Sequence, residues 1–135
     1  MSMESPKSEY LLLFRGTGWH KNLSPEEIQE VMTRWMAWFD GLTEKGIAQT
    51  GQPLADEGKI VSGSKGQTIV DGPFAESKEA IGGYFLLKVD SPEEAVEIAR
   101  QCPALDYGVT VEVRPVVECC GAAHAASVAA ASASV

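Results

Sequence analysis

The sequence predicts a single α+β domain. Two observations carry this prediction: short apolar runs of strand length, and two helix starts of the form Ser-Pro-Glu-Glu at residues 24–27 and 91–94. The chain has 135 residues, which fits one domain, and 44% of them are hydrophobic, an ordinary fraction for a globular protein. A core of this size needs neither disulfide bonds nor metal ions for its stability.

The first part of the chain predicts a strand followed by a long helix. Residues 10–15, Tyr-Leu-Leu-Leu-Phe-Arg, are too few for a helix and are typical of a buried strand. Ser24 can cap a helix, and Glu27 completes a capping box. Because apolar residues recur behind the cap at steps of three and four, the helix is expected to reach about Lys45, with Gly46 as its C-cap. These apolar residues are Ile28, Val31, Met32, Trp35, Trp38, Phe39 and Leu42.

The glycine-rich middle of the chain, residues 47–83, predicts short strands and turns. Within it, residues 59–62 and 67–70 flank Gly-Ser-Lys-Gly, which is typical of a hairpin connection, and Asp-Gly-Pro at residues 71–73 is a turn signal. Three further elements are expected: a strand at residues 84–89, a helix from Ser91 to about Cys102 and a strand at residues 108–115.

The expected order is strand, helix, strands, strand, helix, strand. One sheet built in this order is the βαββαβ plan of a ferredoxin-like domain, here with an extra hairpin, and the plan places both helices on one face of the sheet. The strands at residues 10–15 and 84–89 are nevertheless apolar on both faces. Two helices cannot cover both, so we expect the same face of a second copy to bury the other one, which gives a homodimer. The alternative is that the long middle segment folds over that face.

Charge and composition argue against several partners and compartments. The net charge is -8 and the pI is about 4.7, so phosphate backbones and anionic lipid, which proteins bind through Lys and Arg, should repel the chain. No apolar run approaches the roughly 20 residues that span a bilayer, and residues 1–9 lack the pattern of a signal peptide. Cys102, Cys119 and Cys120 have no disulfide-framework spacing, which favours the reducing cytoplasm.

The C-terminal part of the chain and the motifs of the sequence show no signal for a metal or a cofactor. Residues 119–135 are rich in Ala and Ser and are expected to form a mobile tail outside a domain that spans residues 8–118. Cys119 and Cys120 with His124 offer too few ligands for a structural zinc site. The sequence has no dinucleotide-binding, Walker-type or nucleophile-elbow motif. No metal or cofactor is therefore expected.

A block in the middle of the chain carries a family resemblance. Residues 71–79, Asp-Gly-Pro-Phe-Ala-Glu-Ser-Lys-Glu, followed by Gly-Gly-Tyr at residues 82–84, resemble the signature of the DGPF-type proteins of the YCII-related family. Asp-Ser-Pro-Glu-Glu-Ala at residues 90–95 and Val-Glu-Val-Arg-Pro-Val at residues 111–116 agree with it in order and spacing. The resemblance covers roughly residues 8–118.

The resemblance implies a dimeric α+β barrel, in which two sheets face each other and enclose a central space. Enzymes on this fold include isomerases, monooxygenases and a dehydrochlorinase. DGPF-type proteins themselves are largely uncharacterised; many are encoded beside alternative sigma factors, and some are called transcription-initiation proteins. In the shorter YCII branch, a His on the first helix and an Asp form the proposed catalytic pair. Trp35 stands at the position of that His here, so the pair is absent as such.

Two residues are candidate catalytic groups. Asp71, ahead of Gly-Pro at a sheet end, could act as a general base or accept a hydrogen bond from a ligand, or it could simply cap the turn. Tyr84 follows two glycines, and its hydroxyl could act as an acid or a hydrogen-bond anchor, or its ring could pack in the sheet. His20 is interpreted as a solvated loop residue.

Five residues are candidate ligand contacts. Arg15 and Arg114 end two strands that are expected to be neighbours only through intermediate strands, and each could hold a carboxylate through a bidentate fork or pair with Asp or Glu. Lys78 and Glu79 belong to a charged cluster that could hold a substrate anion, form a dimer contact or pair internally. Trp35 could form a cofactor wall, but an aromatic stripe at helical spacing is usually core.

Two functions are predicted. The first is a dimer that binds a small, mainly apolar molecule in its cleft and could catalyse proton transfer, with Asp71 as base and Tyr84 and an arginine as orienting groups. The alternative is a non-enzymatic accessory or regulatory protein near the transcription machinery, whose acidic surface suits a basic protein partner. An open cleft lined by Asp71 and a second titratable group favours the first function. A filled interior with residues 76–79 displayed outside favours the second.

Overall fold

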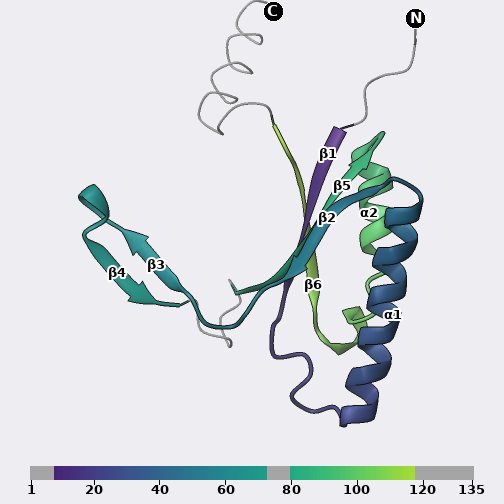
Figure 1. Ribbon diagram of the computed structural model, residues 1–135, viewed down its shortest axis with the longest axis horizontal. Coiled ribbons are helices and arrows are strands. Elements are labelled where there is room, and N and C mark those ends of the chain that lie inside the picture. The colour runs from purple at the N-terminus through teal and green to yellow at the C-terminus, as the bar shows by residue number, and fades with distance from the viewer. Residues whose placement is uncertain (1–7, 73–79, 118–135) are drawn as a thin grey trace, which may run out of the picture.

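The computed structural model describes residues 8–72 and 80–117. In this part of the chain, a four-stranded antiparallel sheet of order β2-β5-β1-β6 carries both helices on one face (Figure 1). The elements are β1 (Ser8–Arg15), α1 (Pro25–Glu44), β2 (Ala48–Pro53), β3 (Lys59–Ser62), η1 (Ser64–Gly66), β4 (Thr68–Asp71), β5 (Ile81–Val89), α2 (Pro92–Ala99), η2 (Leu105–Tyr107) and β6 (Thr110–Pro115).

The predicted fold is confirmed. Strands β1, β2, β5 and β6 with α1 and α2 follow the βαββαβ plan, and β3 and β4 form a separate two-stranded ribbon inserted between β2 and β5. The crossover through α2 returns β6 to the edge beside β1, so that Leu11 lies opposite Arg114. The expectation that the strands of Arg15 and Arg114 meet only through intermediate strands is therefore wrong.

Local sequence signals explain where the helices begin and end. At the start of α1, Ser24 Oγ accepts from the Glu27 N–H at 3.1 Å and Glu27 Oε1 accepts from the Ser24 N–H at 3.1 Å, the predicted capping box. Ser91 caps α2 in the same way, accepting from the Glu94 N–H at 3.2 Å. Helix α2 ends at Ala99, three residues before the predicted end at Cys102. Pro103 disfavours the helical region for Cys102, the residue before it, so the helix cannot easily continue past this point.

The core lies between the helices and one face of the sheet. Alternate residues of β1 and β5 point to that face and are buried, among them Leu12 and Leu87, which have no exposed surface. Val31 of α1 and Ala95 of α2 pack in the same hydrophobic cluster. Burial of each larger apolar side chain contributes roughly 1.5–3 kcal/mol, so these residues hold the helices on the sheet.

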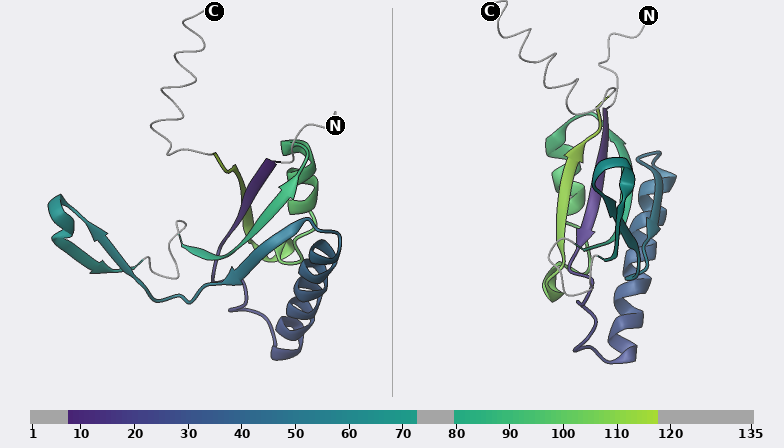
Figure 2. Two further views of the ribbon diagram at one scale, coloured as in Figure 1. Left: turned by 45° about the horizontal axis from the view of Figure 1, so that its top comes forward. Right: turned by 90° about the vertical axis from the view of Figure 1, so that its left-hand side faces the viewer.

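The opposite face of the sheet is open and, along its central strands β1 and β5, apolar as predicted, whereas Glu112 and Arg114 of the edge strand β6 add charged side chains to it. Leu11, Leu13, Tyr84 and Leu86 lie on it and are half-buried. The inserted ribbon does not cover them: all residues of β3 and β4 are exposed, and the ribbon projects from the end of β2 on the side away from the helices (Figure 2). Residues 54–72 therefore do not fold over this face, which was the alternative to a dimer. The homodimer stays a prediction.

Candidate functional site

A cavity of about 390 Å³ opens at one end of the four-stranded sheet. Its walls come from five places: the end of β1 with the following loop, the middle of α1, the end of β2 with the residues after it, the start of β5, and Val109 ahead of β6. The antiparallel pairing brings these segments together, because the end of β1 and the end of β2 both lie beside the start of β5. Six aromatic residues line it: Phe14, Trp19, Trp35, Phe39, Tyr84 and Phe85.

The aromatic wall is tightly packed and therefore pre-formed. Phe14 meets Trp35 edge-to-face at a centroid distance of 5.0 Å and Phe85 at 4.8 Å. Phe39 and Phe85 are 4.7 Å apart, and Trp19 lies 6.4 Å from Trp35. Trp35 and Phe39 are one helical turn apart on α1, which is why both reach the same wall.

Glycine at position 51 lets β2 approach this wall. A Cβ atom there would lie 2.7 Å from Phe85 Cδ1 and 2.9 Å from both Phe39 Cε1 and the Tyr84 carbonyl oxygen. Separations this short do not occur in real structures, so a larger residue would have to displace an aromatic ring or the neighbouring strand. Gly51 thereby fixes the distance between β2 and the aromatic residues of α1.

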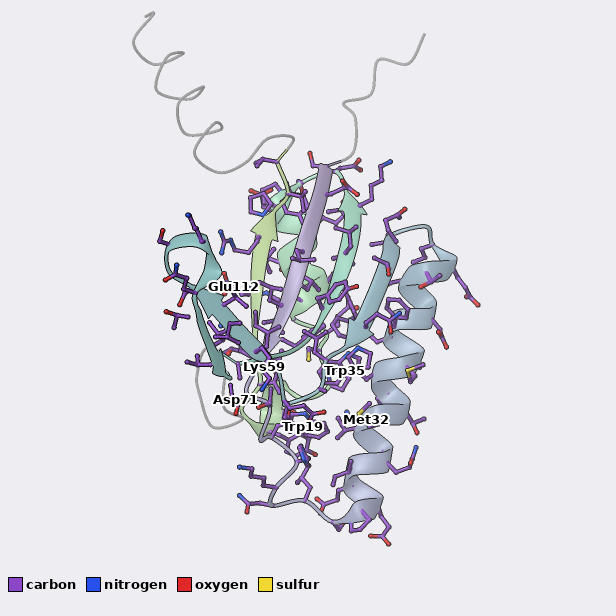
Figure 3. The ribbon with its side chains drawn as sticks, turned by 60° about the vertical axis from the view of Figure 1, so that its left-hand side comes forward. Trp19, Met32, Trp35, Lys59, Asp71 and Glu112 are labelled. Carbon is purple, nitrogen blue, oxygen red and sulfur yellow. The ribbon has the colours of Figure 1, made fainter. Side chains whose placement is uncertain are left out.

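The mouth of the cavity is apolar and exposed. Met32, Met36 and Leu54 line it, and they are 39%, 55% and 46% exposed. Figure 3 shows Met32 and Trp35 extending from α1 toward the loop that carries Trp19. Flexible methionine side chains adapt to ligands of irregular shape, so this exposed apolar rim is suited to admit a small molecule.

The polar side chains of the lining are few. They are Arg15, Thr17, His20, Gln52, Asp56 and Tyr84. Arg15 donates two hydrogen bonds to Glu112 Oε1, from Nε at 2.9 Å and from Nη2 at 2.6 Å, and Arg114 Nη1 donates to Glu112 Oε2 at 3.0 Å. These hydrogen bonds, first from Arg15 and then from Arg114, hold the pKa of the Glu112 carboxyl below its ordinary value of 4.5. Glu112 thus stays ionised and fixes the Arg15 guanidinium at the edge of the cavity.

The structure brings together some of the residues that the sequence singled out. Arg15, Trp35 and Tyr84 line the cavity. Asp71 does not: it ends β4, forms an ion pair with Lys59 across the ribbon, and has a side chain that is 73% exposed. Arg114 is also outside the lining and pairs with Glu112.

Two candidate residues cannot be placed. Lys78 and Glu79, with the rest of the charged cluster, lie outside the described residues. Their proposed contacts with an anion or with a second copy stay predictions, as does the catalytic role of Asp71.

Sequence reasoning missed several residues of the lining. Met32 belongs to the predicted apolar stripe but was not singled out as a candidate, and it lies at the exposed mouth. Met36, Leu54 and Asp56 were not singled out, and His20 was interpreted as a solvated residue; it is exposed, but it also lines the cavity. Trp19 carries the one usable signal, since a tryptophan in a glycine-rich loop is unusual enough to suggest a packing role.

Metal and membrane features are not seen in residues 8–72 and 80–117. Across these ranges, no three His, Cys, Asp or Glu side chains gather where they could share a metal ion. Neither of the two described helices is long and apolar enough to cross a bilayer.

Comparison with known proteins identifies the family. The family model of the YCII-related domain matches residues 8–119. The chain belongs to the YCII-related family. The DGPF-type segment thus predicted the family correctly, although most of that segment lies outside the described residues.

Two further likenesses of this YCII-related chain are more distant. It is 44% identical over 54 residues to an uncharacterised protein of Rhizobium meliloti (strain 1021), in a match that covers 38% of the chain and 44% of that relative. The chain therefore spans less than half the length of this curated relative. A hypothetical protein of Arabidopsis thaliana, known from a solution structure, is 14% identical, with a TM-score of 0.39 over 89% of this chain and 96% of that one. Neither likeness assigns a ligand or an activity to this YCII-related chain.

Proposed function

We propose that this YCII-related protein is a cytoplasmic homodimer that binds a small, mainly aromatic molecule in the cavity at the end of the sheet. One observation carries the proposal: a cavity of about 390 Å³ with a pre-formed aromatic wall opens to solvent through an exposed apolar mouth. Ligand sites typically span about 300–1,000 Å³ and combine apolar walls with a few polar groups. The volume is near the lower end of that range, which fits a single-ring or two-ring compound.

The polar end of the ligand is proposed to meet Arg15 and Tyr84. Arg15 is held by Glu112, so its position is set before a ligand arrives. The Tyr84 hydroxyl can donate a hydrogen bond, or a proton in an acid–base step, to an oxygen of the ligand. An aromatic carboxylic acid or phenol therefore matches the lining better than an amine does.

A catalytic step is a narrower proposal than binding. Asp71 lies outside the cavity lining, so the proposed base is His20 or Asp56, which both line the cavity. Imidazole and carboxylate groups are the usual proton acceptors in enzymes.

The alternative function, an accessory protein of the transcription machinery, depends on residues 76–79, and nothing in the described part of the chain favours it.

The homodimer is supported by the open face of the sheet. Leu11, Leu13, Tyr84 and Leu86 give that face an apolar character, and contiguous apolar surface of this kind usually marks an interface. A two-fold axis would place the same face of both copies in contact.

The binding proposal is tested with a thermal-shift screen of aromatic acids and phenols. A compound at about 100 times its Kd should stabilise the protein by roughly 2.7 kcal/mol. Met36→Lys puts a charge in the exposed mouth without disturbing the core, and it should abolish the shift. Ala37→Lys, the matched change at the next exposed position of α1, should retain it, because Ala37 does not line the cavity.

The role of Tyr84 is tested with a second matched pair. Tyr84→Phe removes only the hydroxyl and should weaken binding of a hit about 5- to 10-fold, the effect of losing one hydrogen bond. Because Tyr84 also lies on the face proposed for the homodimer, sedimentation of the variant checks that its assembly is unchanged. Tyr107→Phe makes the same change outside the lining and should leave binding unaltered. If no compound stabilises the wild type, or if Met36→Lys responds as strongly as Ala37→Lys, the cavity is not the site.

A further inference from the structure

The ribbon between β2 and β5 forms a projecting arm, defined here as residues 58–72. A hydrogen bond of 3.1 Å from the Gly72 N–H to the Gly58 carbonyl closes its base, where Lys59 pairs with Asp71 (Figure 3). The arm carries two cross-strand apolar pairs, Ile60 with Val70 and Val61 with Ile69. Because successive residues of a strand alternate in direction, the two pairs lie on opposite sides of the ribbon.

The apolar side chains on both sides of the arm are largely exposed to solvent. Ile60, Val61, Ile69 and Val70 are 42%, 61%, 63% and 48% exposed. A two-stranded ribbon alone is at best marginally stable in water, and burial against another surface is what normally stabilises it. The described remainder of the chain does not offer that surface, since the arm extends away from the sheet on its open side (Figure 2).

We propose that the arm grips a second copy of this chain: each arm passes beside the partner's sheet and packs its apolar side chains against the partner's flank. The inference rests on the proposed homodimer through the open sheet faces. It adds that the arms, and not the faces alone, hold the two copies together.

The length of the arm fits this arrangement. From Gly58 to the tip at Lys65 the chain can extend roughly 20 Å, at about 3.3 Å per residue. Facing sheets pack about 10 Å apart. An arm that leaves one sheet on its open side therefore reaches past the partner's sheet and ends beside the partner's helices.

The open face of the sheet is smaller than the area that a stable protein–protein interface usually buries. Four strands spaced about 4.8 Å apart, two of them about 20 Å long and the central two somewhat under 30 Å, present a flat area of roughly 450 Å². Stable interfaces bury about 800 Å² on each partner. Two arms, each exposing four large apolar side chains, supply contact area that the sheet faces lack.

The charge of the arm complements the surface that it would reach. The arm carries Lys59, Lys65 and Asp71, a net positive charge within a chain of net charge -8. The two helices are rich in exposed Asp and Glu; Arg34 is the basic residue within them, and Lys45 and Arg100 stand at their C-caps. Lys65 at the tip adopts a left-handed conformation with a φ of 57°, where glycine or asparagine is usual.

The first test is sedimentation of arm variants by analytical ultracentrifugation, with circular dichroism to verify that each folds. Val61→Asp should raise the dimer dissociation constant at least tenfold, because the charge enters both arm contacts of the two-fold dimer. Leu105→Asp changes an exposed leucine of η2, outside the arm, the open face and both α-helices, and should alter it less than threefold. Lys65→Asn removes the charge while suiting the left-handed backbone, and it should weaken association about two- to fivefold.

The second test locates the arm directly. A photo-crosslinker at position 61, in a mixture of tagged and untagged copies, should give a product that contains both chains. A product confined to one chain, or none, would overturn the proposal. A monomeric wild type at micromolar concentration would refute the homodimer and the arm together, whereas an unchanged dimer in Val61→Asp would refute the arm alone.

Discussion

Glu112 organises the charged groups on the open face of the sheet. It accepts hydrogen bonds from Arg15 and Arg114, and Arg15 in turn lines the cavity. Hydrogen bonds from two guanidinium groups favour the ionised form of a carboxylate, which agrees with the lowered pKa of Glu112. The position of Arg15 therefore depends on the charge of Glu112.

Glu112→Gln should change the pH dependence of stability. The folded-state pKa of Glu112 lies below its ordinary value of 4.5, so on acidification the unfolded chain takes up the proton first. The carboxylate therefore stabilises the fold above pH 4.5, and this contribution disappears as the pH falls through the folded-state value. Melting temperatures measured from pH 7 to 3 should be lower for Glu112→Gln at pH 7 and converge with the wild type below pH 4.5.

A matched variant separates this effect from a general loss of surface charge. Glu97 pairs with Arg100 on the surface of α2, with both side chains at least 70% exposed. Glu97→Gln should shift the melting temperature little at any pH, because exposed pairs contribute only about 0–1 kcal/mol. A constant difference between Glu112→Gln and the wild type across the whole pH range would contradict the account.

The residue types in the sequence indicated which side chains could form ion pairs, but they did not show which partners those side chains have. Arg15 and Arg114 were expected to pair with a carboxylate or a ligand, and both pair with Glu112. Asp71 was singled out because it precedes Gly-Pro. Its pairing with Lys59 depends on the register of β3 and β4, which the turn residues alone do not specify.

Two glycines, one in α1 and one in β2, differ in what surrounds them. A Cβ atom at Gly41 would meet nothing within 4 Å, whereas at Gly51 it would collide with two aromatic rings and a backbone carbonyl. Gly41 therefore only weakens its helix, and Gly51 is required by the packing of β2 against α1.

Alanine substitutions at these two positions should have opposite effects on stability. Gly41→Ala should stabilise the protein by about 0.5–1 kcal/mol, the usual gain from replacing glycine inside a helix. Gly51→Ala should destabilise it by about 1–3 kcal/mol, because the added methyl group overpacks the aromatic wall. Urea denaturation followed by tryptophan fluorescence measures both; a stabilising Gly51→Ala would mean that β2 is not held against α1 as described.

Elements with strong local signals were predictable, and elements set by tertiary contacts were less so. The capping residues Ser24 and Ser91 located both helix starts, and the alternation in β1 and β5 gave the two faces of the sheet. The direction of the β3–β4 ribbon was not predictable, because an exposed hairpin carries no pattern that shows where it points.

The cavity is a property of the whole fold. Its lining comes from residues as far apart in the chain as Phe14, Phe39 and Val109, which only the sheet topology brings together. Of the seven candidate residues, Arg15, Trp35 and Tyr84 line it, and none of them was distinguishable by spacing from a residue of the core. A sequence pattern reports one face of one element, so a site built from several elements cannot be read from it.

The central claim, that the cavity binds a small aromatic molecule, is tested most directly by NMR of methionine methyl groups. The chain has four methionines, and Met32 and Met36 both lie at the mouth of the cavity. In protein labelled with ¹³C at the methionine methyls, a compound that stabilises the fold should shift the Met32 and Met36 signals in proportion to its occupancy. A compound that raises the melting temperature but leaves both signals unmoved would show that the ligand site lies elsewhere.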